Sequence, residues 1–419
     1  MAHAHPHPGE DHSGYVAPPA LRRLLTLIVV PLVLATVAGL AVLWPRGDGP
    51  SLGAGIGVAD DLVPATVRSR EVVPCEGGGG GEPGEDEGSA DEAANPADAV
   101  RCTLLEIEIT EGIDEGQTIA LDFVESPRTP SIAEGDRIVL GYESDAEPGS
   151  EYFYADRQRG RPLLLLTALF ALAVVALGRW GGVRALVALG LSLLVIVSFL
   201  LPALLRGSSP LAVAVVAASA IMILALYLSH GVTVRTTTAL LGTLASLIVT
   251  GLLAASFVAA GRFTGLASEE ATFLSAVAGQ IELDGLLLAG VIIGSLGVLD
   301  DVTVTQASAV WELHLANPAY RARDLYSAAL RIGRDHIAST VNTLVLAYAG
   351  ASLPLLVLFS LANRDLGDVL TGEVVAQEVV RTLVGSVGLV ASVPITTGLA
   401  AWIVTRPAAE DPSLLAEGA

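Results

Sequence analysis

The sequence predicts an α-helical membrane protein with about eight transmembrane helices and a small β-rich domain inserted after the first helix. Three observations support this fold class. The chain of 419 residues has 52% hydrophobic residues and a mean hydropathy of +0.61, which is too apolar for an ordinary soluble domain. Several runs of about 20 residues are nearly free of charge, the length that crosses a bilayer. Residues 46–160 instead hold 26 acidic and 8 basic residues, and short alternating apolar runs.

The first predicted span, residues 24–44, follows Arg22 and Arg23 and has no clear signal-peptidase site, so we interpret it as a retained anchor. The sixth predicted span is short and rich in glycine, and a tilted or re-entrant segment is an alternative there. The other seven predicted spans are 162–178, 183–203, 208–228, 236–260, 284–299, 338–361 and 381–404, of which 284–299 is the sixth span.

Arginine distribution predicts the orientation of the chain. Ten arginines flank the spans on the side of the N-terminus and five on the other side, so the positive-inside rule places both termini in the cytoplasm. The predicted segments are a His-rich tail (1–20), the first helix (21–45), the extracytoplasmic domain (46–160), a membrane domain of seven helices (161–405) and a cytoplasmic tail (406–419). We expect the lipid bilayer of a bacterial plasma membrane to be the surrounding medium.

The predicted outer domain contains both cysteines of the chain. Cys75 and Cys102 bracket residues 76–101, an acidic, glycine-rich segment that we expect to be a disordered loop. Outside the cell the two thiols can form a disulfide that closes this loop; two unpaired thiols are the alternative. Alternation of apolar and acidic residues at 105–109, with further apolar runs at 119–123 and 138–142, predicts half-buried strands.

Composition excludes several functions. Every basic residue is arginine, so a P-loop and a lysine Schiff base are ruled out. A chain this acidic without a basic stripe gives no case for nucleic-acid binding. No cofactor is predicted. The N-terminal tail carries alternating histidines that could chelate a divalent metal weakly, although an unstructured tail without a metal role is the alternative: His3, His5, His7 and His12.

The candidate site begins with two adjacent carboxylates, Asp300 and Asp301, at the end of the sixth predicted span. One interpretation is an N-cap for a helix at 302–315. The other is a cation or proton site at the inner membrane edge, where carboxylates are costly and mark pathways. Helical spacing favours a polar stripe, with Gln306 beside it: Asp301, Thr305, Ser308 and Glu312.

A second group of polar residues precedes and enters the seventh predicted span. Arg331 and Asp335 are spaced to pair along a helix. The alternatives are an ordinary positive-inside anchor or a face that meets Asp300 and Asp301 in a buried ionic network. This second group comprises Arg331, Asp335, His336 and Asn342. A threonine-rich segment at 236–238 is interpreted as a helix N-cap.

Four long segments resemble the YibE/F family of bacterial multi-pass membrane proteins: LPALLRGSSPLAVAV, LYLSHGVTVRTTTALLGT, AGVIIGSLGVLDDVTVTQASAVWEL and RIGRDHIASTVNTLVLAYAGASLPLLVL. The resemblance covers most of residues 100–404, and the loop at 76–101 departs from it. It implies a polytopic membrane protein and assigns no catalytic residue.

Three functions remain open from the sequence. The leading hypothesis is transport of a small solute or ion through the polar stripe, although no inverted repeat stands out along the chain. An accessory, assembly or sensing protein that acts through its outer domain is the alternative. A membrane-embedded hydrolase would need a nucleophile–base pair or a metal site, which the sequence does not assemble. Substrate and oligomeric state are not defined.

Overall fold

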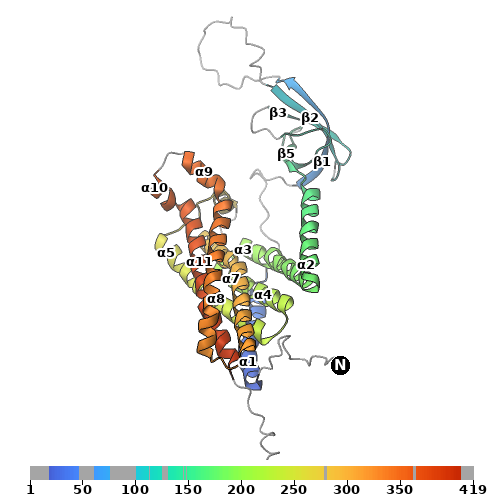
Figure 1. Ribbon diagram of the computed structural model, residues 1–419. Coiled ribbons are helices and arrows are strands. Elements are labelled where there is room, and N and C mark those ends of the chain that lie inside the picture. Colours follow the sequence, from blue (N-terminus) through green and yellow to red (C-terminus); the bar gives the residue numbers. More distant parts are fainter. Residues whose placement is uncertain are drawn as a thin grey trace, which may run out of the picture. The chain divides into compact units, whose positions relative to one another are not determined.

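The computed structural model describes residues 18–46, 61–75, 101–112, 114–124, 131–144, 146–147, 149–277, 281–361 and 365–406 (Figure 1). The chain divides into two compact units. One consists of residues 52–172 and is called the β unit below. The other consists of residues 1–51 and 173–419 and is called the helical unit. The histidines of the N-terminal tail and residues 76–100 of the predicted acidic loop lie outside the described residues, and Arg101 begins the second strand.

The β unit is built on one antiparallel sheet of five strands in the order β3-β2-β1-β4-β5. The long first strand pairs with β4 along its first half and with β2 along most of its length, with a register shift between Val67 and Ser69. The alternating runs in the sequence therefore form strands. They are β1 (Asp61–Pro74), β2 (Arg101–Ile109), β3 (Thr118–Val124), β4 (Arg137–Tyr142) and β5 (Tyr152–Arg157).

Period-two alternation places the apolar side chains of this sheet on one face. Leu105, Ile107 and Ile109 are fully buried, while Glu106 and Glu108 between them point outward. Glu106 accepts a hydrogen bond from Ser69 and Glu108 pairs with Arg68, both on the neighbouring strand. The β unit thus has an apolar core and a charged surface, as a domain in water requires.

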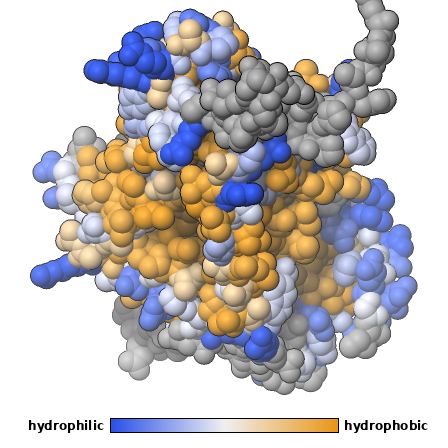
Figure 2. All heavy atoms as spheres, turned by 90° about the horizontal axis from the view of Figure 1, so that it is seen from below, coloured by the Kyte–Doolittle hydropathy of each residue, from blue (hydrophilic) through white to orange (hydrophobic). Residues whose placement is uncertain are grey.

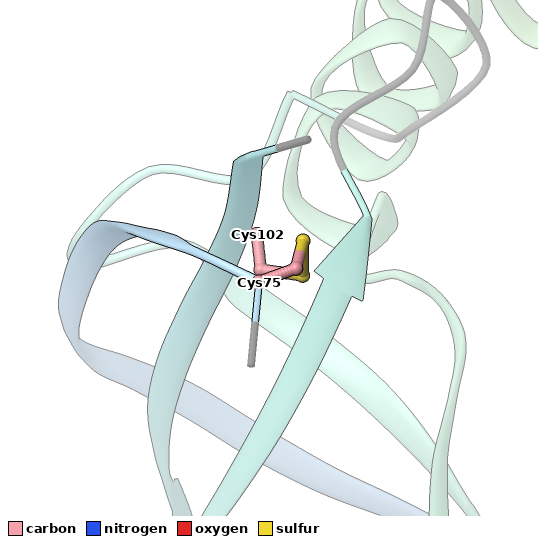
Figure 3. The surroundings of a disulfide bond; sticks show 2 residues. All are labelled: Cys75 and Cys102. Atoms are coloured by element: carbon pink, nitrogen blue, oxygen red, sulfur yellow. A yellow bond between two sulfur atoms is a disulfide. The ribbon is translucent and has the colours of Figure 1, made fainter. Parts of the chain in front are cut away.

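A disulfide joins the end of β1 to the start of β2 (Figure 3). Cys75 directly follows β1, and Cys102 lies opposite Val73 in the strand pairing, so the two Cα atoms are 4.9 Å apart. The bond closes the segment between the two strands, which limits the freedom of that segment in the unfolded chain.

The helical unit contains long apolar helices joined by short connections (Figure 1). The elements are α1 (Pro19–Leu43), α2 (Gly160–Val195, whose first part belongs to the β unit), a π-helical turn η1 (Ile196–Leu200), α3 (Leu201–Leu205), α4 (Pro210–His230), α5 (Val234–Gly261), α6 (Glu269–Val277), α7 (Leu283–Ala316), α8 (Ala322–Ala351), α9 (Leu353–Leu361), α10 (Leu366–Thr371) and α11 (Glu373–Val404).

Among the described residues, six helices are long and apolar enough to cross a membrane, or seven when α8 and α9, bent by 61°, count as one span. The stretch from Gly160 to Leu205 is one of the six, although its backbone leaves helical geometry at Arg179, with φ 52° and ψ −130°. This kink falls between the predicted second and third spans. The described residues therefore form long apolar helices over the predicted segments, but they give six or seven candidate spans where eight are predicted.

Three helices, α5, α7 and α11, pack against one another along their lengths and form the centre of the helical unit. The outward faces of this unit carry exposed leucines and isoleucines, including Leu252 at 66% and Ile248 at 64% exposure. Figure 2 shows hydrophobic residues over a broad area of the surface. Polar residues are instead buried between the three helices, and this reversal fits a hydrocarbon environment.

Candidate functional site

Asp300 and Asp301 lie within α7, four to five helical turns from its start. The helix runs without interruption from Leu283 to Ala316, so the backbone N–H groups near the aspartates are already bonded within the helix. The N-cap interpretation is therefore wrong, as is the re-entrant alternative for the sixth span. Residues 284–299 and 302–315 form one helix because nothing in the intervening sequence breaks it: it has neither proline nor a capping conformation.

The predicted polar stripe faces outward from the three-helix centre. Asp301, Thr305 and Glu312 are exposed and Ser308 is half-buried. The opposite face of α7 holds Gln306 and Thr303, which are both buried. The i, i+4, i+7, i+11 spacing correctly groups the four stripe residues on one face, but it cannot indicate whether that face is turned toward or away from neighbouring helices.

Asp300 occupies an intermediate position at the edge of the buried face. Its Oδ1 atom is buried and has no hydrogen-bond partner among the described residues. The backbone carbonyl of Asp300 accepts a hydrogen bond from Thr303, 3.1 Å away. A buried carboxylate oxygen without a donor is unfavourable, because the lost hydration is not replaced. The arrangement can be relieved by a proton or by a bound cation.

The neighbouring Asp301 contacts α8. The distance between its Oδ2 atom and Nε2 of His336 is 4.0 Å. The aspartate side chain is 72% exposed and that of the histidine 39%, so water screens this pair and its contribution to stability is small. The contact nevertheless brings one residue of the second predicted group next to the two aspartates.

The other members of the second group do not join the aspartates. Asp335 and Asn342 are exposed on α8. Arg331 is also exposed and donates to the backbone carbonyl of Ser327 at 3.2 Å, and the structure shows no ion pair between Arg331 and Asp335. Of the predicted buried ionic network, the described residues therefore show only the solvent-screened pair of Asp301 and His336.

Gln306 has a structural position between α7 and α8. Its Nε2 atom donates to the backbone carbonyl of Ala329 at 2.8 Å. Gly333 on α8 allows this approach, because a Cβ atom there would lie 2.8 Å from Oε1 of Gln306. A buried amide that bonds a backbone carbonyl of the next helix holds the two helices in register.

The sequence interpretation missed a row of buried hydroxyl groups behind Asp300. Thr243 on α5 and Thr303 on α7 share a hydrogen bond of 2.5 Å between their Oγ1 atoms. Thr243, Ser246 and Thr250 follow one another at spacings of three and four residues on α5, which predicts one polar helix face. That spacing was the signal in the sequence. The row continues on α11 with Ser392, Thr396 and Thr397, all fully buried.

A threonine caps the start of α5, as predicted, but the capping residue is Thr233 and not a residue of the segment 236–238. Thr233 accepts a hydrogen bond from the backbone N–H of Thr236 at 3.0 Å. Thr236, Thr237 and Thr238 lie inside the helix and are buried. Near this end, His230, Arg235 and Ser308 line a cavity of about 20 Å³.

Metal binding has no support from clustered ligands in the described ranges. No group of three histidine, cysteine, aspartate or glutamate residues is placed to hold a metal ion there. Asp300, Asp301 and His336 do not form such a group, and the four tail histidines lie outside the described residues.

Comparison with known proteins places the helical part of the chain in a family. Residues 166–406, more than half of the chain, match a family model described as YibE/F-like protein. The matched region begins after β5 ends at Arg157, so it contains the helical elements from α2 to α11 and none of the strands. No curated protein and no solved structure matches the chain.

Proposed function

This chain belongs to the YibE/F-like family, and we propose that it is a transporter of protons or small cations in which Asp300 binds the transported ion. The observation that carries the proposal is the buried, unpartnered Oδ1 atom of Asp300 in the middle of a helix long and apolar enough to cross a membrane. An ionisable residue at such a position is costly to maintain and typically marks an ion pathway.

The surroundings of Asp300 favour a positively charged substrate. Asp301 adjoins it in sequence and adds a second carboxylate, and Nε2 of His336 lies 4.0 Å from that carboxylate. An anion would be repelled by the two carboxylates. The hydroxyl pair Thr243–Thr303 lies one turn farther along α7 and offers neutral oxygen ligands toward the centre of the unit.

The proposal includes a topology of eight spans. The kink at Arg179 would separate the second from the third span, and the bent pair α8 and α9 would form the seventh. An even number of spans agrees with the arginine distribution, which favours cytoplasmic termini and an extracytoplasmic location for residues 46–160. A bacterial plasma membrane would be the location.

The test uses purified protein reconstituted in lipid vesicles. Proton and cation fluxes would be followed with a pH-sensitive dye inside the vesicles and with potassium, sodium and magnesium gradients. We expect Asp300→Asn to reduce flux at least about tenfold, because each tenfold effect needs only about 1.4 kcal/mol of lost binding. Asp335→Asn is the matched control, since this exposed carboxylate on α8 should leave flux unchanged. Flux of Asp300→Asn equal to the parent protein would contradict the proposal.

One observation favours the alternative, a sensing or accessory role for the β unit. A cavity of about 300 Å³ in this unit is lined by acidic and aromatic residues: Asp61, Glu111, Asp114, Tyr142 and Tyr152. The two tyrosine rings are 5.1 Å apart between centroids. Carboxylates beside aromatic faces are typical of sites for organic cations. Deletion of residues 46–160 without loss of any cellular phenotype that the full chain supports would exclude this alternative.

A further inference from the structure

Two helices of the helical unit have similar sequences. Residues 234–258 of α5 and residues 380–404 of α11 align without a gap, and 11 of the 25 positions are identical. Both segments begin with Val-Arg-Thr and continue with the pattern G-x-x-A-S-x-x-x-T. Helices rich in alanine, valine and leucine produce some identities by composition alone. The shared arginine, glycine, serine and threonine positions are harder to explain in that way.

Burial follows the same alignment. Of the twelve buried residues of α5, eleven align with a buried residue of α11, the exception being Thr237, which aligns with Leu383. Ser246 and Ser392 are an aligned pair, and both are fully buried. The two helices therefore present equivalent faces to the interior, which sequence similarity alone would not require.

The contacts between α5 and α11 are those of an approximate two-fold axis. A Cβ atom on Gly242 would lie 2.3 Å from Oγ1 of Thr396, and a Cβ atom on Gly388 would lie 1.9 Å from Oγ1 of Thr250. The alignment pairs Gly242 with Gly388 and Thr250 with Thr396. Each contact is thus the copy of the other, as in the interface of a two-fold dimer, where residue i meets j and j meets i.

The order of these contacts makes the two helices antiparallel. The contact at Gly242 lies at the N-terminal side of α5 and toward the C-terminal side of α11, and the contact at Gly388 has the reverse placement. The two copies of Val-Arg-Thr consequently lie at opposite ends of the helix pair. Such an arrangement is an inverted repeat, the construction typical of secondary transporters.

The two equivalent ends differ in one respect. At the Arg235 end, Thr236 lines the cavity of about 20 Å³ with His230 and Ser308. At the Arg381 end, the equivalent Thr382 lines a cavity of about 260 Å³ between α8, α9, α10 and α11. Tyr348, Ser352 and Glu378 also line the larger cavity. Equivalent sequence positions therefore border a large cavity at one end and a small one at the other.

We infer that α5 and α11 are inverted copies of one helix, and that the two cavities are the alternating entrances of a transport path on either side of their two-fold axis. The inference rests on the proposed transport function. In an inverted repeat, exchanging the conformations of the two copies exchanges the open end for the closed end. The structure then holds the state that is open at Arg381 and closed at Arg235.

The experiment uses the two serines that line the cavities. Ser308→Cys and Ser352→Cys are made singly in the full chain, whose only native cysteines are bonded to each other. Both substitutions are close to isosteric. Inverted membrane vesicles and intact cells are treated with a membrane-impermeant maleimide. We expect the two positions to be labelled from opposite sides. Labelling of both from the same side would overturn the assignment of two entrances.

Alternation is tested by closing the larger cavity. Val345 on α8 and Val379 on α11 both line it, and a third variant carries cysteines at these positions together with Ser308→Cys. A short bifunctional thiol reagent, added from the Ser352 side, should raise the labelling rate at position 308 at least about fivefold by shifting the population to the opposite state. A long reagent, which leaves the cavity open, and a monofunctional reagent are the controls.

An unchanged labelling rate at position 308 after the short cross-link would overturn the alternation. This readout involves neither flux nor Asp300. Normal flux in Asp300→Asn with the expected labelling would therefore reject Asp300 as the ion-binding group and leave the two entrances standing. If Asp300→Asn abolishes flux but the short cross-link leaves the labelling rate at position 308 unchanged, Asp300 stands as the ion-binding group and the alternation of the two entrances is rejected.

Discussion

The two units of this protein bury opposite kinds of residue. The β unit closes around Leu105, Ile107 and Ile109 and places its charges on the surface. The helical unit turns leucine and isoleucine side chains outward and buries Thr243 and Ser246 on α5 together with Ser392 and Thr396 on α11. Water drives the first arrangement, because burial of apolar surface is favourable there. In hydrocarbon that driving force between helices is absent, and close packing of small and polar residues takes its place.

The largest expected effect is in the β unit. Ile107→Ala should lower its free energy of unfolding by about 4 kcal/mol, since a fully buried isoleucine would be replaced by a cavity. Chemical denaturation followed by tyrosine fluorescence would measure the loss. Leu62→Ala, at a position 66% exposed, is the control and should have little effect. A comparable loss in both variants would show that the sheet has no apolar core.

A somewhat smaller effect is expected in the helical unit from the opposite change, an added methyl group. Gly388→Ala should destabilise the unit by about 3 kcal/mol, because its Cβ atom would collide with Thr250. Adding Thr250→Ala should restore most of the loss. Thermal unfolding in detergent would measure both variants, with Gly350→Ala as the control, since no atom lies within 4 Å of a Cβ atom there. Failure of the double variant to recover would reject the glycine–threonine contact.

The smallest effect concerns pH in the β unit. Burial, followed by the hydrogen bond that Tyr152 donates to Asp114 at 2.5 Å, raises the pKa of Tyr152 well above its usual range. The unfolded chain, with a tyrosine pKa of about 10, loses this proton first. The protonated Tyr152 therefore stabilises the folded β unit fully below about pH 10, and this stabilisation decreases as pH rises toward the folded-state pKa. Tyr152→Phe should flatten this decrease in denaturation curves measured from pH 8 to 11. An identical pH dependence in the variant would contradict this account.

Much of this protein follows from local sequence. Runs of apolar residues predict the long helices, and alternation at 105–109 predicts a strand with Glu106 and Glu108 outward. These features depend only on period and length, which adjacent residues determine. The repeat between α5 and α11 is also present in the sequence, but its identities are scattered over 25 positions in helices of similar composition.

Tertiary structure alone decided which polar residues meet. The residues from Asp301 to Glu312 lie on one helix face, as predicted. The packing of α7 turns this face outward, and Gln306 and Thr303 are buried instead. His336 reached Asp301, whereas Asp335, one residue away on the same helix, did not. A helical period defines faces only relative to one another, and their orientation depends on neighbouring helices far away in the sequence. For the same reason, only the packed structure showed that Gly242 meets Thr396 as Gly388 meets Thr250.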